Sequence, residues 1–195
     1  MKSFGATLVA TAFVATVALL PSARSQDHHS TPAEASAAIP SGVRDFDFEF
    51  GEWRVHHRVR SSPEKPWLEF DGTCTTRGIL GGAANVEDHK FDKPSGVTRG
   101  VALRTYDEKT RQWAIWWIDS RNPHGALDPP VVGRFDGGVG TFYSDGELNG
   151  KPLRTRFVWS HITATSARWE QAYSFDAGKT WDANWVMEFR RIQRN

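Results

Sequence analysis

The chain has 195 residues, a length that suits one domain, and its 24 Lys and Arg are balanced by 23 Asp and Glu. This balance provides no field that would attract nucleic acid or an acidic membrane surface, so we expect neither as a partner. Nine Trp and 12 Phe require either a dense core or a ring-lined cavity. The single cysteine, Cys74, excludes an internal disulfide, and a buried, inert thiol is expected.

Residues 1–25 have the pattern of a secretory signal peptide. Lys2 gives a positive start, residues 4–20 are apolar but short for a membrane span, and small residues near Arg24 suit cleavage after Ser25. We therefore expect a periplasmic or secreted protein with no membrane contact after cleavage. Residues 26–42 are polar and rich in Ala, Pro and Ser, which predicts a flexible linker, and the folded domain is expected over residues 43–195.

The rest of the chain is a series of short strand patterns. Phe46 and Phe50 are four residues apart, which predicts a short helical turn that ends at Gly51. Alternating apolar and polar residues then predict ten strands, over residues 54–60, 67–75, 86–91, 100–107, 112–119, 131–135, 140–144, 153–161, 168–175 and 181–189. Residues 78–85 are predicted to be a loop or a sharp bend, 120–130 a long irregular segment, and 145–151 a turn.

Ten strands in meander order predict the fold class: all-β, an antiparallel up-and-down lipocalin-like barrel with a short N-terminal helical turn. A barrel of this strand number has room for a small ligand. The last hairpin contains the sequence SFDAGKTW at residues 174–181, which matches the S-x-D-x-G-x-T-W "Asp box" of sialidases and other β-propellers. A propeller repeats this motif in several blades, and one copy indicates a structural hairpin turn rather than a glycosidase blade.

Four segments carry a family resemblance: FDFEFGEWRVHHR, YDEKTRQWAIWWIDSR, LDPPVVGRF and RWEQAYSFDAGKTWDANWVMEF. Together they resemble an exported bacterial family of unknown function with a lipocalin-like (calycin) fold, over about residues 45–190. The short helical turn followed by G-x-W is similar to the opening of lipocalin-type barrels. The resemblance implies a closed barrel but names neither a ligand nor catalytic residues, because calycins include carriers, haem-binding barrels and a few enzymes.

The candidate ligand-binding residues combine ring-bearing strand positions with a few polar groups. Asp119 and Arg121 end a Trp-rich strand before the long irregular segment, where they could contact a ligand or form an ion pair that only shapes the loop. Arg104 and Tyr106 share a strand face and would suit a carboxylate-bearing ligand. The full candidate set is Trp53, His57, Arg104, Tyr106, Trp113, Trp117, Asp119, Arg121, Trp169, Gln171 and Trp185.

Acid–base and metal chemistry have few candidates. His57 shares a face with Trp53, so it could be a general acid or base, an axial haem ligand, or a core histidine bonded to a neighbour. Asp119 and Glu170 are the candidate catalytic carboxylates. Adjacent strand residues point to opposite faces, so His56 and His57 are not a metal pair, and His89 is isolated in the sequence. We predict no metal and no cofactor.

The main hypothesis is a secreted or periplasmic barrel that binds a small apolar or aromatic molecule. The alternative is a cofactor-free enzyme, a lyase, isomerase or hydrolase, with a pocket histidine or carboxylate as the acid or base. A haem barrel and a structural envelope protein are further hypotheses. The sequence does not predict the oligomeric state.

Overall fold

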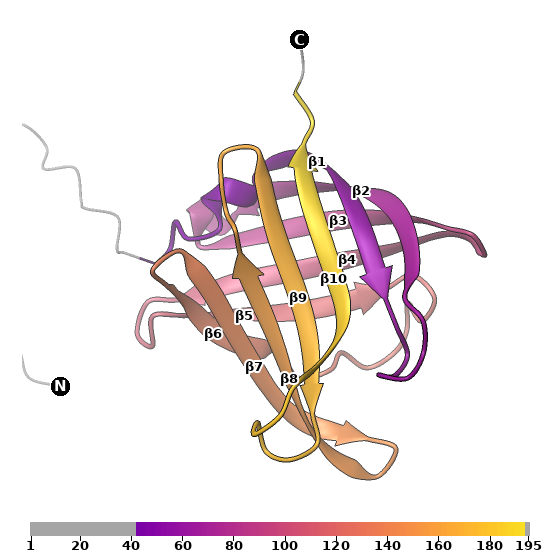
Figure 1. The fold of residues 1–195 in the computed structure, drawn as a ribbon. Coiled ribbons are helices and arrows are strands. Elements are labelled where there is room, and N and C mark those ends of the chain that lie inside the picture. The colour runs from indigo at the N-terminus through magenta and orange to yellow at the C-terminus, as the bar shows by residue number, and fades with distance from the viewer. Residues whose placement is uncertain (1–41, 194–195) are drawn as a thin grey trace, which may run out of the picture. The chain divides into compact units, whose positions relative to one another are not determined.

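The computed structural model describes residues 42–193, which form a closed antiparallel barrel (Figure 1). Around the wall the strands follow the order β1-β10-β9-β8-β7-β6-β5-β4-β3-β2, and β2 pairs with β1. The predicted all-β up-and-down barrel is confirmed. Its elements are η1 (Asp47–Glu49), β1 (Gly51–Val59), β2 (Leu68–Ile79), η2 (Leu80–Gly82), β3 (Ala84–Lys93), β4 (Gly96–Asp107), β5 (Gln112–Asp119), β6 (Val131–Asp136), β7 (Val139–Leu148), β8 (Lys151–Ser160), β9 (Ser166–Ser174) and β10 (Asp182–Arg191).

The predicted signal peptide and, except for residue 42, the predicted linker lie outside the described residues. Within residues 42–193 no helix has the length and apolar character that a membrane span requires.

Alternation along each strand separates the interior of the barrel from its surface. On β1, Trp53, Val55 and His57 are buried, whereas Arg54 and His56 between them are exposed. Successive side chains of a strand point to opposite faces, so the period-2 pattern fixes which residues enter the barrel.

The short helix η1 closes one end of the barrel. We call this end the floor, and its residues are Phe46, Glu49, Trp53 and Trp113 with their neighbours. Trp53 Nε1 donates a hydrogen bond of 2.6 Å to the Glu49 carbonyl oxygen. The Arg191 guanidinium lies 4.1 Å from the Trp53 ring centroid and donates to the carbonyl oxygen of Phe50 at 2.6 Å. These bonds satisfy the carbonyl oxygens of Glu49 and Phe50, which would otherwise lack a hydrogen-bond partner where the helix meets the strand.

Ring packing fills the space above η1. The Phe46 ring centroid lies 5.0 Å from that of Trp113, 5.0 Å from that of Phe135 and 5.8 Å from that of Phe142. Edge-to-face and offset contacts at these distances add to the burial of apolar surface. Part of the high aromatic content therefore forms a dense core at the floor.

Two predicted loops are shorter than expected. β2 continues to Ile79 and β3 begins at Ala84, so the predicted loop over residues 78–85 is reduced largely to η2. β7 and β8 also extend to a tight turn at Asn149 and Gly150, with φ of 52° and 76°, and they project at the lower edge of Figure 1. An Asn-Gly pair with positive φ at both positions matches the twist of a hairpin, which explains why the predicted turn over 145–151 is mostly strand.

The Asp-box segment forms the hairpin turn between β9 and β10, as predicted. Asp176 accepts hydrogen bonds from the backbone N–H of Thr180 at 2.9 Å and from its hydroxyl at 2.6 Å. Ser174 Oγ accepts from the Gly178 N–H at 2.8 Å. The Trp181 ring of the motif lies on the outer surface, where its centroid is 4.4 Å from the Arg156 guanidinium carbon. The motif is a turn of the barrel wall.

Candidate functional site

A cavity of about 510 Å³ lies inside the barrel, and six aromatic rings contribute to its wall. Phe157 and Trp159 alternate along β8, and Trp169 and Tyr173 lie at inward positions of β9. The remaining rings are Trp117 of β5 and Trp185 of β10. The sequence-derived expectation of a ring-lined interior is therefore met by these four strands.

The wall of the cavity is interrupted between β5 and β6. These two strands pair only from Trp113 to Ile115, so the end of β5, up to Asp119, has no partner on β6. Asp119 and Arg121, together with Asp128 in the long segment before β6, line the cavity here. We call this opening, bounded by the end of β5 and residues 120–130, the mouth.

The predicted charged pair at the mouth is an ion pair. Asp119 accepts hydrogen bonds from the Arg121 backbone N–H at 2.8 Å and from Arg121 Nε at 2.9 Å. These bonds from Arg121 hold the pKa of the Asp119 carboxyl below its usual value. Both alternatives for this pair fit the structure, since it shapes the start of the loop and also faces the cavity.

One wall of the cavity carries neutral polar groups. Gln171 Nε2 donates a hydrogen bond of 2.9 Å to Asn184 Oδ1. An irregularity in β10 between Ala183 and Trp185 brings Asn184 to Gln171. Burial raises the pKa of the Tyr173 hydroxyl above 10.0, and hydrogen bonding to Gln171 lowers it in part.

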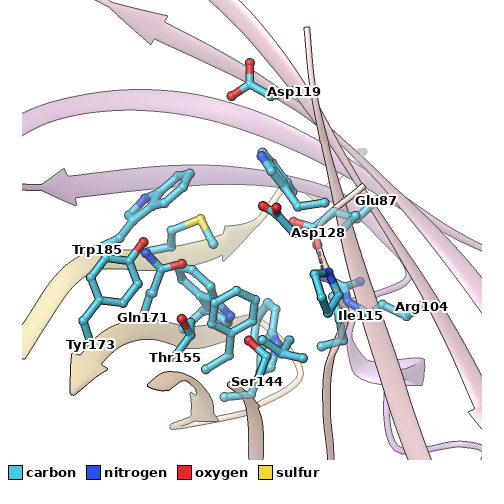
Figure 2. Close-up of a pocket in the computed structure, with 18 of the residues that line it drawn as sticks. Glu87, Arg104, Ile115, Asp119, Asp128, Ser144, Thr155, Gln171, Tyr173 and Trp185 are labelled. Atoms are coloured by element: carbon cyan, nitrogen blue, oxygen red, sulfur yellow. Dashed lines mark hydrogen bonds and ion pairs between the residues drawn. The ribbon is translucent and has the colours of Figure 1, made fainter. Parts of the chain in front are cut away.

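The opposite wall carries a buried charge cluster. Arg104 donates to Glu49 at 2.6 Å and 3.3 Å, to Asn85 at 3.0 Å, and to Glu87. In Figure 2, Gln171, Tyr173 and Thr155 lie on one side of the cavity, and Arg104 and Glu87 lie on the other. The expectation that Arg104 binds the carboxylate of a ligand is corrected. The guanidinium of Arg104 is already bonded to two carboxylates of the protein itself, those of Glu49 and Glu87.

The structure brings seven of the predicted ligand-binding residues together around the cavity: Arg104, Trp117, Asp119, Arg121, Trp169, Gln171 and Trp185. Four others lie elsewhere in the barrel: Trp53, His57, Tyr106 and Trp113. Trp53 and Trp113 belong to the floor, and Trp113 Nε1 donates to the Gly42 carbonyl oxygen at 2.8 Å. All four face inward as predicted, but Trp53, Tyr106 and Trp113 lie toward the floor, and His57 lies beside the cavity behind Trp185.

His57 lies in a ring cluster beside the cavity. Its ring is stacked on Phe70 with centroids 4.8 Å apart, and its Nδ1 accepts a hydrogen bond from Trp185 Nε1 at 3.3 Å. Burial is the main cause that lowers the pKa of His57 to about 2. A histidine with this pKa is neutral at physiological pH, which fits the core interpretation of His57 better than the acid–base one.

Glu170 faces away from the cavity. On β9 it alternates with the inward-facing Trp169 and Gln171, and it accepts a hydrogen bond of 2.7 Å from Arg168. Arg156 lies 3.7 Å from its other oxygen. Its assignment as a candidate catalytic carboxylate is therefore corrected, because the pleat of the strand directs it to the outer surface.

Several residues of the site are not among the predicted ones. Phe157, Trp159 and Tyr173 lie at inward positions of predicted strands, and their alternation could have identified them. Asp128 was assigned only to the irregular segment. A buried group of Cys74, Glu87 and His89 was also missed, since its members come from two strands whose register the sequence does not give.

Comparisons with known proteins give a family and a fold. The model of the DUF1579 family, described as a protein of unknown function, matches residues 46–189. No curated protein matches the sequence at a significant level. Among solved structures, the S-type phycobiliprotein lyase CPES from Guillardia theta has a TM-score of 0.54 at 9% identity, covering 79% of this chain and 94% of that one. Rv2717c from M. tuberculosis also has a TM-score of 0.54, at 10% identity, covering 80% and 99%. At these identities the similarity concerns the barrel fold alone.

Proposed function

The chain belongs to the DUF1579 family of proteins of unknown function, and we propose that it binds a small aromatic or apolar molecule in its barrel cavity. The observation that carries this proposal is the cavity of about 510 Å³ with six rings in its wall. Binding sites for small molecules usually have volumes of about 300–1,000 Å³, mostly apolar walls and a few well-placed polar groups. The cavity has each of these properties.

One polar feature indicates how a guest is oriented. The Gln171 amide and the Tyr173 hydroxyl form a polar position on one wall of the cavity. A planar guest with one or two oxygen or nitrogen atoms fits this arrangement.

Binding is favoured over the alternative of a cofactor-free enzyme by the positions of the acid–base candidates. His57 and Glu170 do not line the cavity, and Asp119 is paired with Arg121 at the mouth. A general acid or base must reach the reacting atom of the substrate within hydrogen-bonding distance. Of the three candidates, only Asp119 lines the cavity, and its low pKa makes it a weak base and keeps it from donating a proton at neutral pH.

A fluorescence titration with 1-aminoanthracene tests the proposal. We expect saturable binding at one site in the micromolar range, which corresponds to about −8 kcal/mol at 1 μM. Thr155→Phe places a ring in the cavity and is expected to weaken binding by about tenfold or more, or about 1.4 kcal/mol. Thr141→Phe, at an outward position of β7, is the matched control and should bind like the unchanged protein. Equal binding by both variants would contradict a site in the cavity.

We further propose that the protein acts in the periplasm or outside the cell, on the basis of the signal-peptide pattern in residues 1–25. Mass spectrometry of the protein isolated from cell fractions is the test. The expected product begins at Gln26 and is found outside the cytoplasm. A cytoplasmic protein that retains Met1–Ser25 would contradict this location.

A further inference from the structure

The buried group of Cys74, Glu87 and His89 lies between the cavity and the floor. Cys74 of β2 and His89 of β3 are direct neighbours across the two strands, and Glu87 is two residues before His89 on the same face. All three residues are at most 2% exposed. The candidate ligand atoms, one from each residue, lie within 4.8 Å of one another.

The contact between Glu87 and His89 is close, but it is not a hydrogen bond. Glu87 Oε1 lies 2.7 Å from His89 Nε2, yet the relative orientation of the two groups leaves both atoms without a hydrogen-bond partner. His89 Nδ1 also has none within the described part of the chain. Buried polar atoms are nearly always bonded, so unpartnered atoms that converge in this way indicate that a shared partner is missing beside them.

We propose that Cys74 Sγ, Glu87 Oε1 and His89 Nε2 bind a divalent transition metal ion, with Zn²⁺ as the best fit. Thiolate, imidazole and carboxylate are the three ligand types that zinc uses in proteins, at about 2.0–2.3 Å. Arg104 holds the other oxygen of Glu87 and thereby orients it toward the ion, as groups behind metal ligands commonly do. This proposal departs from our expectation of no metal site, which rested on spacing along the sequence.

Three protein ligands leave a fourth tetrahedral position, as in zinc sites that bind water or a substrate. Glu87 and Arg104 also line the cavity, so one ligand of the proposed ion borders the space that a guest would occupy. When the ion binds, the Cys74 thiol forms the bond from sulfur to metal and releases one proton to solvent.

The test uses the whole protein after dialysis against a chelator. Equilibrium dialysis with Zn²⁺ should give about one bound ion per chain, and Co²⁺ should give a thiolate-to-cobalt charge-transfer band in the near ultraviolet. Cys74→Ser changes one atom and keeps the volume, so the barrel should still fold. It is expected to abolish the band and to weaken Zn²⁺ binding by at least the 10–100-fold that loss of a supporting group costs. His89→Phe should have the same effect on Zn²⁺.

His161→Phe is the matched control, because His161 is exposed at the end of β8 and should leave both signals unchanged. Circular dichroism and a thermal melt show whether each variant is folded. Failure of the folded, unchanged protein to retain Zn²⁺ or Co²⁺ at micromolar free ion would overturn the proposal. Binding that survives Cys74→Ser, or a cobalt complex without the charge-transfer band, would overturn it as well. The 1-aminoanthracene titration of chelator-treated protein is independent of these outcomes, so failure of one proposal does not imply failure of the other.

Discussion

Replacement of Arg104 by Met removes the single cation from a buried cluster that contains two carboxylates. The guanidinium has donor contacts to Glu49, to Asn85 and to Glu87, and its side chain is only 3% exposed. Removal of one partner from a buried ion pair costs about 3–5 kcal/mol, because the remaining charges are left unpaired. For a domain of this size, each kcal/mol lowers Tm by about 2–4 °C, so a decrease of about 6–20 °C is expected.

Urea denaturation followed by tryptophan fluorescence measures this change in the chelator-treated protein. Arg99→Met is the matched control on the same strand, since Arg99 is 59% exposed and lies 3.9 Å from Asp88. That control should change the free energy of unfolding by about 0.5 kcal/mol or less. A second variant, Arg104→Met with Glu49→Gln, removes one of the unpaired carboxylates and should recover part of the loss.

Two results would refute this reasoning. An Arg104→Met protein as stable as the Arg99→Met control would mean that the buried carboxylates do not depend on Arg104. A double variant that is less stable than Arg104→Met alone would mean that the loss comes from packing rather than from unpaired charge.

Three further predictions concern other parts of the barrel. Gly133→Ala would place a methyl group 1.9 Å from a backbone oxygen of β7, so urea denaturation should show a loss of roughly 1–3 kcal/mol, and no loss would contradict the close contact. Gly100→Ala would place one 2.1 Å from the Trp117 ring and push it toward the cavity, so the Kd for 1-aminoanthracene should change, whereas an unaltered Kd would argue against a guest beside that ring. The hydrogen bond to Asp71 raises the pKa of His56, so Asp71→Asn should lower the midpoint of the His56 NMR titration toward 6.5. Because the folded-state pKa is raised, the pair stabilises the fold below about pH 6.5 and ceases to do so as the pH rises through the folded-state value, so Asp71→Asn should destabilise the protein more at about pH 5 than at about pH 8.

The strands were predictable because alternation has a period of two residues and depends only on local sequence. The predicted fifth strand, Gln112–Asp119, agrees with β5 at both ends. Errors arose where glycines lie within strands, as at Gly78 in β2 and Gly146 in β7. A glycine in a strand resembles a turn signal in the sequence, whereas pairing with the neighbouring strand keeps it extended.

The site was only partly predictable, because alternation separates inside from outside but does not give depth. Trp113 and Trp117 face the interior from the same strand, yet Trp113 is in the floor and Trp117 lines the cavity. Their positions depend on where η1 plugs the barrel, which is a property of tertiary packing. The contact between Gln171 and Asn184 likewise depends on an irregularity in β10 that the sequence does not reveal.

The register between strands decides which distant residues meet. Cys74 and His89 are neighbours only because β2 and β3 pair across η2 in one particular alignment. A shift by one residue would turn His89 to the outside. Spacing along the sequence therefore could not identify this group.

The limited pairing between β5 and β6 has a consequence for the motions of the barrel. Three residue pairs join these strands, whereas nine join β1 to β2 and ten join β3 to β4. Local opening of a protein begins where the fewest backbone bonds must break. Amide protons in the second half of β5 should therefore exchange with solvent sooner than those of β3. Transient separation of β5 from β6 would let a molecule wider than the mouth pass through the wall of the barrel.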